Sequence, residues 1–227
     1  MRLKPNNPVL SERRTIHIKS RKPITDKQVI KSVATNNKLG KGSNIITKGK
    51  WKGWPMFSIT LEERATCPSY CHHWDDCFGN NMAFAHRFIA GPELEDKIRT
   101  EVRILSLLYK NFVIRLHILG DFYSRQYVMM WHKLLADYPG LHIFGYTAHW
   151  NTPGITDEIM AIRTRFASRF WVRFSTNNKL HTPAIIATRE DYTEPAITCP
   201  EQQGKVDSCL GCGLCWAIEK PIKFLSH

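Results

Sequence analysis

The sequence predicts an α/β fold in which a parallel sheet curls into a partial or irregular (β/α) barrel. Apolar runs with strand character alternate along the chain with segments whose apolar residues recur at helical spacing. The connections between them are short, and right-handed crossovers between such strands would curl the sheet toward a barrel. No apolar stretch comes near the roughly 18 residues that a membrane helix requires, and no apolar signal core follows the N-terminus. We therefore expect a cytoplasmic protein that has no membrane partner.

Each predicted element has its own signal. The run at 112–119 (FVIRLHIL) is apolar on both parities, which suits a buried strand. Ser124 is a predicted N-cap, and Pro139 ends the helix that Ser124 begins. In chain order the sequence predicts a strand at 55–61, a helix at 92–110, the strand at 112–119, the capped helix, a strand at 141–147, a helix at 157–166, a strand at 170–175 and a strand at 184–188.

The net charge of +12 lies in the first 53 residues of the chain. That segment holds 14 of the 32 Lys and Arg residues and only two acids, Glu12 and Asp26, whereas residues 54–227 are neutral overall. It is also poor in apolar residues, with a short helix predicted at 25–33 and a loop at 36–50. The sequence therefore predicts a basic N-terminal arm at 1–53 and an α/β domain at 54–227.

The basic arm has two interpretations. An excess of Lys and Arg favours contact with the phosphates of a nucleic acid, and the alternative is a solvated surface. Within the arm, the stretch KGKWKGW interleaves cations and rings, as in proteins on which single strands stack. The same stretch is equally suited to docking the arm on the domain. The candidate nucleic-acid-binding residues are Lys48, Lys50, Trp51, Lys52 and Trp54.

Seven cysteines form two groups, and no cysteine lies outside them. The first group has the spacing C-x3-C-x5-C and consists of Cys67, Cys71 and Cys77. The second has the spacing C-x9-C-x2-C-x2-C and consists of Cys199, Cys209, Cys212 and Cys215. An odd number of cysteines in a chain without a secretion signal argues against a disulfide framework and favours metal binding.

The second group favours an iron–sulfur cluster. Its compact run and its remote Cys199-Pro200 pair are similar to the ferredoxin pattern, which holds a [4Fe-4S] cluster. Gly211 and Gly213 allow the tight backbone that brings amide donors near the sulfurs. Structural zinc usually takes two separated pairs of ligands, and this group instead has a run of three and one remote cysteine. Zinc is therefore the less favoured alternative.

The first group lacks an obvious fourth cysteine, so a cubane held there keeps one iron open to an exogenous ligand. This resembles the radical S-adenosylmethionine enzymes, in which the cofactor's amino acid end binds the open iron. Their usual spacing is C-x3-C-x2-C, and here the third cysteine comes three residues later. Other interpretations are a zinc site completed by His72 or His73, iron ligation by Asp75 or Asp76, and a cluster shared with one cysteine of the second group.

Polar residues follow three of the predicted strands, at the edge where parallel sheets collect functional groups. The candidate cofactor-binding residues are Gly120, Asp121, Tyr146, Thr147, Ser175 and Asn177. The Gly120-Asp121 turn is similar in position to the Gly-Gly-Glu turn of the radical enzymes. That resemblance implies that Asp121 binds the amino group of S-adenosylmethionine. Each of these residues also suits a simple turn.

Several segments resemble the phage-encoded gene product eighty-eight domain family. They are Asn37-Lys38-Leu39-Gly40, Thr66-Cys67-Pro68, Leu119 to Ser124 (LGDFYS), Phe144 to Thr147 (FGYT) and Cys209 to Trp216 (CLGCGLCW). The resemblance extends from about residue 37 to the C-terminus and excludes the basic residues before it. It implies a phage or mobile-element origin, hence a host-cell cytoplasm, and cluster binding, without defining a reaction.

Three functions are consistent with these features. The first is an iron–sulfur protein with a radical-enzyme-like body that acts on or at nucleic acid. The second is a non-catalytic nucleic-acid-binding protein with structural or redox-sensing clusters. The third is a structural protein stapled by zinc.

Overall fold

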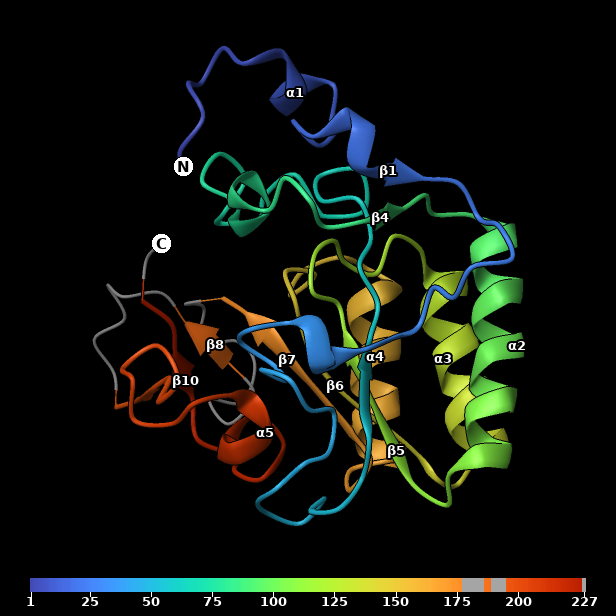
Figure 1. Cartoon of the computed structure of the whole chain (residues 1–227). Helices are drawn as coiled ribbons and strands as arrows, with labels where there is room; N and C mark the ends of the chain where they lie inside the picture. The colour runs from blue at the N-terminus through green and yellow to red at the C-terminus, as the bar shows by residue number, and fades with distance from the viewer. Residues whose placement is uncertain (177–185, 189–194, 226–227) are drawn as a thin grey trace.

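A mostly parallel sheet of eight strands forms the centre of the computed structural model (Figure 1). The structure describes residues 1–176, 186–188 and 195–225. The strand order is β2-β3-β5-β6-β7-β8-β10-β9, and only the pairing of β2 with β3 is antiparallel. The predicted α/β class with a parallel sheet is confirmed. The edge strands β2 and β9 do not pair with each other, so the described sheet does not close into a barrel.

The elements are mostly short outside the centre of the sheet. The strands are β1 (Arg21–Lys22), β2 (Lys31–Ser32), β3 (Met56–Ser58), β4 (Arg87–Phe88), β5 (Phe112–Leu116), β6 (Leu141–Thr147), β7 (Phe170–Ser175), β8 (Ile186–Thr188), β9 (Ile197–Thr198) and β10 (Ile222–Lys223). The α-helices are α1 (Pro8–Ser11), α2 (Pro92–Leu108), α3 (Arg125–Asp137), α4 (Ile155–Arg165) and α5 (Cys209–Cys212). Within the described residues, no helix is long and apolar enough to cross a membrane.

The periodicity of the sequence located the central elements well. β6 and β7 span the predicted residues 141–147 and 170–175, and α2 ends two residues before its predicted end. The Ser124 hydroxyl accepts the backbone N–H of Tyr127 at 3.1 Å, which confirms the predicted N-cap of α3. β3 and β5 are shorter than predicted, because the chain leaves the sheet early to form the loops described below. β8 covers 186–188 of the strand predicted at 184–188, and its first two predicted residues lie outside the described residues.

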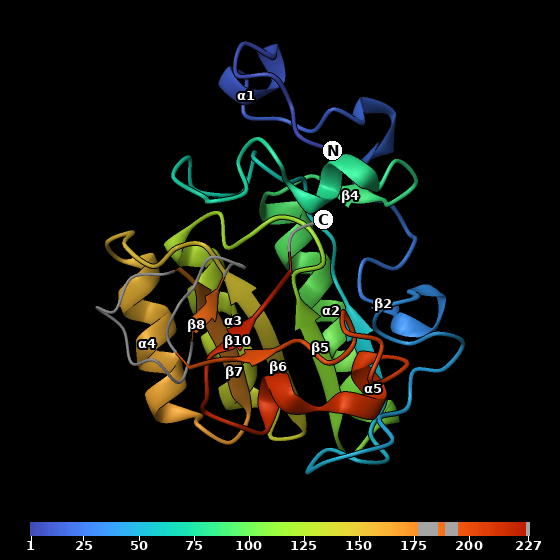
Figure 2. The same ribbon diagram turned by 90° about the vertical axis from the view of Figure 1, so that its left-hand side faces the viewer.

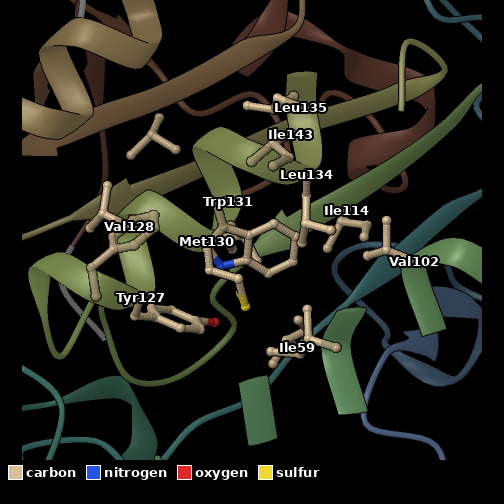
Figure 3. Close-up of a cluster of buried hydrophobic side chains, with 14 of the residues drawn as sticks. Ile59, Val102, Ile114, Tyr127, Val128, Met130, Trp131, Leu134, Leu135 and Ile143 are labelled. Atoms are coloured by element: carbon tan, nitrogen blue, oxygen red, sulfur yellow. The ribbon is translucent and has the colours of Figure 1, made fainter. Parts of the chain in front are cut away.

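The main core lies between the sheet and the helices α2, α3 and α4, which cover one face of it (Figure 1). Alternate residues of β5 point into this core, among them Ile114. Trp131 of α3 lies at its centre, between Tyr127 on the same helix and Ile59 (Figure 3). The Trp131 side chain is fully buried, so this packing anchors α3 to the sheet.

The second core lies on the opposite face of the sheet. Two segments cover this face: the chain from about residue 33 to residue 54, and the C-terminal segment around α5 (Figure 2). They pack on the alternate residues that β5, β6 and β7 direct to this face. Trp51 stacks on Trp216 with ring centroids 5.4 Å apart, and Phe144 of β6 packs on Trp216 from the sheet side. Both tryptophans are at most 2% exposed.

Part of the basic segment at 1–53 packs into the cores of the α/β domain. Six buried apolar side chains of this segment belong to the two cores: Val29, Ile30, Val33, Leu39, Ile46 and Trp51. The helix predicted at 25–33 is wrong. The carboxylate of Glu101 accepts the backbone N–H groups of Val29 and Ile30, and Lys31–Ser32 pairs with β3 instead. Tertiary partners for the backbone thus outweighed a weak local helix propensity.

Candidate metal centres

The loop that carries the first cysteine group touches the end of β5. Gly120 has φ +79°, and a Cβ there would lie 2.6 Å from both the Leu61 Cβ and the Thr66 Oγ1. The backbone N–H of Asp121 donates to that Thr66 hydroxyl at 3.0 Å. Only glycine allows this close approach, which brings Cys67, the next residue after Thr66, to the carboxyl edge of the sheet.

The three thiols of the first group gather around this point. Burial raises the pKa of Cys67, and the nearby Asp121, Cys71 and Cys77 raise it further. Burial also raises the pKa of Cys71 to about 12. The backbone amide of His73 donates to the Cys71 sulfur, and that of Gly79 donates to the Cys77 sulfur. Amide donors of this kind offset the negative charge that the sulfurs would carry as thiolates.

A buried ionic network supports this loop, which contains little regular secondary structure. The Arg87 Nε donates to the Glu63 Oε2 at 2.6 Å, and both side chains are at most 1% exposed. The Arg87 Nη2 donates to the carbonyl of Gly79 at 2.9 Å, two residues after Cys77. The other carboxylate oxygen of Glu63 accepts the Thr15 hydroxyl at 2.7 Å, so the N-terminal segment closes the network.

Asp121 lies beside the first group, as expected, but its carboxylate already has partners. Its Oδ1 accepts the N–H of Phe122 at 2.8 Å, and its Oδ2 accepts the N–H of Ala148 at 2.7 Å. The Thr147 hydroxyl also hydrogen-bonds it, while burial raises its pKa. Asp121 thereby joins the carboxyl ends of β5 and β6.

Two buried histidines lie near Asp121. The Nδ1 of His149 is 2.8 Å from the Thr152 hydroxyl, and its Nε2 has no hydrogen-bond partner among the described residues. Burial lowers the pKa of His117 to about 3, so this imidazole is neutral. Its Nε2 lies 3.0 Å from the Tyr127 hydroxyl, whereas its Nδ1 is buried without a hydrogen-bond partner among the described residues.

The second cysteine group surrounds one pocket. Its lining includes all four cysteines, Cys199, Cys209, Cys212 and Cys215. Backbone bonds hold the compact run against the N-terminal segment, because the N–H of Cys209 donates to Lys38 and that of Thr47 donates to Leu210. Gly213, with φ +74°, ends α5 and turns the chain back toward Cys215. The amide of Leu214 donates to the Cys212 sulfur.

Tyr146 and Thr147, predicted together as cofactor-binding residues, serve different groups. They are neighbours in β6, so their side chains point to opposite faces of the sheet. Thr147 contacts Asp121 beside the first group, whereas the Tyr146 hydroxyl donates to the sulfur of Cys215 in the second. Ser175 lies half-buried at the end of β7. Asn177 lies outside the described residues.

The alternative ligands considered for the first group have other partners. The Nδ1 of His73 is 2.9 Å from the Asp76 Oδ1. The guanidinium of Arg2 bonds Asp75 at 3.1 Å and Asp76 at 3.2 Å. His72 also has interactions within the fold. The paired side chains of His73, Asp75 and Asp76 stabilise the loop around the cysteines.

The KGKWKGW stretch docks on the domain, so the interpretation of Trp51 as a base-stacking ring is wrong. Trp51 is 2% exposed, because it lies against Trp54 and Trp216. The Lys50 ammonium lies 4.0 Å from the ring centroid of Trp171 on β7. The remaining candidates in the stretch, Lys48 and Lys52, are exposed.

Two arginines on the face of the sheet that carries the second core were not among the predicted site residues. Arg173 of β7 donates to the carbonyls of Cys215 and Lys220, both at 3.0 Å, and so holds the second cysteine loop to the sheet. Arg115 of β5 lies over the ring of Tyr146, 4.7 Å from its centroid. The signal for both was available, because a lone arginine inside an apolar strand must find partners to be buried.

The thiols are gathered, but they are not placed as ligands of an ion. Among the described residues, no three His, Cys, Asp or Glu side chains could hold a metal ion as they stand. No protein-family model, no curated protein and no solved structure matches the chain. The assignment of a function therefore depends on the geometry of the two cysteine groups.

Proposed function

We propose that this chain is an iron–sulfur protein with a separate cluster at each cysteine group. The observation that carries the proposal is the convergence of all seven cysteines on two places, three beside Asp121 and four around one pocket. A close group of thiolates without cations is costly, because each charged thiolate disfavours its neighbours. Iron ions would remove that cost. A bound cluster would supply one-electron transfer.

The surroundings of the sulfurs suit metal-bound thiolates, and the ferredoxin-like spacing of the second group favours an iron–sulfur cluster over zinc. Backbone amides already donate to the sulfurs of Cys71, Cys77 and Cys212, in each case from the residue two positions later. Amide-to-sulfur hydrogen bonds and burial are the levers by which proteins set cluster potentials. Within this proposal Arg173 fixes the second loop to the sheet, and the Gly120 turn positions the first.

The enzymatic form of the proposal adds S-adenosylmethionine at an open iron of the first cluster. The place suits it, because the first group lies at the carboxyl ends of parallel strands, on a sheet whose order β3-β5-β6-β7 follows the chain, as in a partial barrel. The residue implied for the amino group fits less well, since both oxygens of Asp121 already accept backbone amides. The proposal therefore extends first to the clusters.

Metal and sulfide analysis of anaerobically purified chain tests the clusters. We expect brown protein containing iron and acid-labile sulfide. Replacing the three cysteines of the first group by Ser should remove one part of the iron, and replacing the four of the second should remove the rest. Colourless protein with stoichiometric zinc would contradict the proposal. An electron-resonance spectrum of reduced protein that is unchanged by S-adenosylmethionine would contradict the enzymatic form and leave a non-catalytic cluster protein.

A nucleic-acid partner has a separate observation in its favour. Lys22, Lys27, Lys31 and His86 line one surface pocket together with Phe88, and no acid is among its lining residues. Burial lowers the pKa of His86, and the three lysines lower it further. Such a concentration of positive charge suits the phosphates of a nucleic-acid strand.

Substitution tests this partner better than truncation, because residues 1–53 contribute to the cores. Changing Lys22, Lys27 and Lys31 together to Gln should weaken binding of a single-stranded oligonucleotide and reduce its salt dependence. The matched control changes Arg103, Lys110 and Lys133, exposed residues on or beside α2 and α3, and should have little effect. Equal losses in the two variants would mean that only net charge matters.

A further inference from the structure

The phenol of Tyr146 is aimed at one sulfur of the second cysteine group. Its hydroxyl donates a hydrogen bond to the Cys215 Sγ, 2.6 Å away. A phenol hydroxyl carries a proton at neutral pH, so it can donate to a thiolate. Among the described contacts of the four second-group sulfurs, this hydrogen bond comes from a side chain, whereas the one to the Cys212 sulfur comes from the backbone.

Both partners of this hydrogen bond are held in place by the sheet. The Arg115 guanidinium lies over the Tyr146 ring, and its Nη1 is anchored on the carbonyl of Leu116 at 2.6 Å. From β7, Arg173 holds the Cys215 backbone by its carbonyl at 3.0 Å. Three adjacent strands, β5, β6 and β7, thus fix the phenol and the sulfur relative to each other. A contact this constrained is pre-organised for the thiolate that a cluster requires.

A donor on a ligand sulfur has a defined electronic effect. Reduction adds negative charge to a cluster and its thiolates, so a hydrogen bond to a sulfur stabilises the reduced state more than the oxidised state. We propose that Tyr146 is a positioning residue of the second cluster, which orients Cys215 and raises the reduction potential through its hydroxyl. This inference depends on the proposed function, because it requires a cluster at the second group.

The test uses the full chain with the first group removed by Cys67→Ser, Cys71→Ser and Cys77→Ser, so that a single cluster is observed. Tyr146→Phe keeps the ring under Arg115 and removes only the donor. At a fixed potential we expect the ratio of reduced to oxidised cluster to fall about tenfold, which corresponds to about 59 mV for a one-electron couple. Tyr138→Phe, at the end of α3 on the other side of the sheet, is the control and should leave the ratio unchanged.

A second substitution keeps the test valid if Tyr146→Phe loads poorly. Replacing Tyr146 by 3-fluorotyrosine preserves the shape and makes the hydroxyl a stronger donor, so the potential should rise. Unchanged potentials in the Tyr146 variants, at equal iron content, would overturn the inference and leave the cluster proposal intact. Absence of iron and sulfide from the parent chain with an intact second group would overturn the proposed function itself.

Discussion

Arg87 should be the most sensitive single residue in the support of the first cysteine group. Arg87→Met keeps much of the side-chain volume and removes the guanidinium from the Glu63 carboxylate, whose side chain is 1% exposed. Glu63 is then left with the Thr15 hydroxyl, a neutral donor too weak to replace a cation. The carbonyls of Gly79, Met82 and Ala85 lose a donor in addition.

Removing one partner of a buried ion pair costs about 3–5 kcal/mol, a large part of the roughly 5–15 kcal/mol that stabilises a domain. Urea unfolding measures it, as a lower midpoint at an unchanged slope. The double variant Arg87→Met with Glu63→Gln removes both charges and should recover part of the loss. Arg99→Met breaks an exposed pair with Glu95 on α2 and should cost less than about 1 kcal/mol. A double variant no more stable than Arg87→Met would refute the reasoning.

Three further outcomes follow from contacts in the fold. Gly120→Ala should destabilise the chain by about 1–3 kcal/mol and reduce the iron content at the first group, because the added Cβ would clash with Leu61 and Thr66. The control Gly42→Ala, at φ +97° in open space, should cost less and leave the iron content unchanged. Equal iron losses in the two variants would contradict this. Trp51→Ala should cost about 3–5 kcal/mol in urea unfolding, and a loss under about 1 kcal/mol would mean that the ring does not anchor the second core. The pKa of His117 is lowered to about 3, so the unfolded chain binds a proton that the folded chain does not between about pH 3 and 6.5. The stability should therefore rise with pH across that window and be fully present above it, and His117→Gln should flatten the slope of unfolding free energy against pH; an unchanged slope would contradict the assignment.

The central elements could be predicted because their signals are local. The alternation of apolar runs gave the correct bounds of β6 and β7, and the Ser124 hydroxyl capped α3 within three residues of sequence. The basic segment could not be predicted in this way. Its few apolar residues are scattered along the chain. They are buried because the Glu101 carboxylate accepts backbone N–H groups of the segment and because apolar side chains of the segment pack on the otherwise open face of the sheet.

In the candidate sites, too, the local features could be predicted from the sequence and the contacts between distant residues could not. The spacing of the cysteines separates them into two groups, because short loops keep neighbouring thiols together whatever the rest of the chain does. The spacing could not assign Tyr146 to the second group and Thr147 to the first, since the two faces of a strand serve different parts of the molecule. It also could not show that the Asp121 carboxylate joins β5 to β6.

By itself, the sequence determined the α/β class, the order of the central strands and helices along the chain, and the two sets of thiols. Periodicity and spacing act over a few residues, so they can be seen without the fold. The tertiary structure decided where the charge and the aromatic rings go. It turned a basic segment into a cover for the second core, placed Trp51 on Trp216 and brought a phenol from β6 to Cys215. These contacts join residues far apart in the chain, and only the packing of the sheet brings them together.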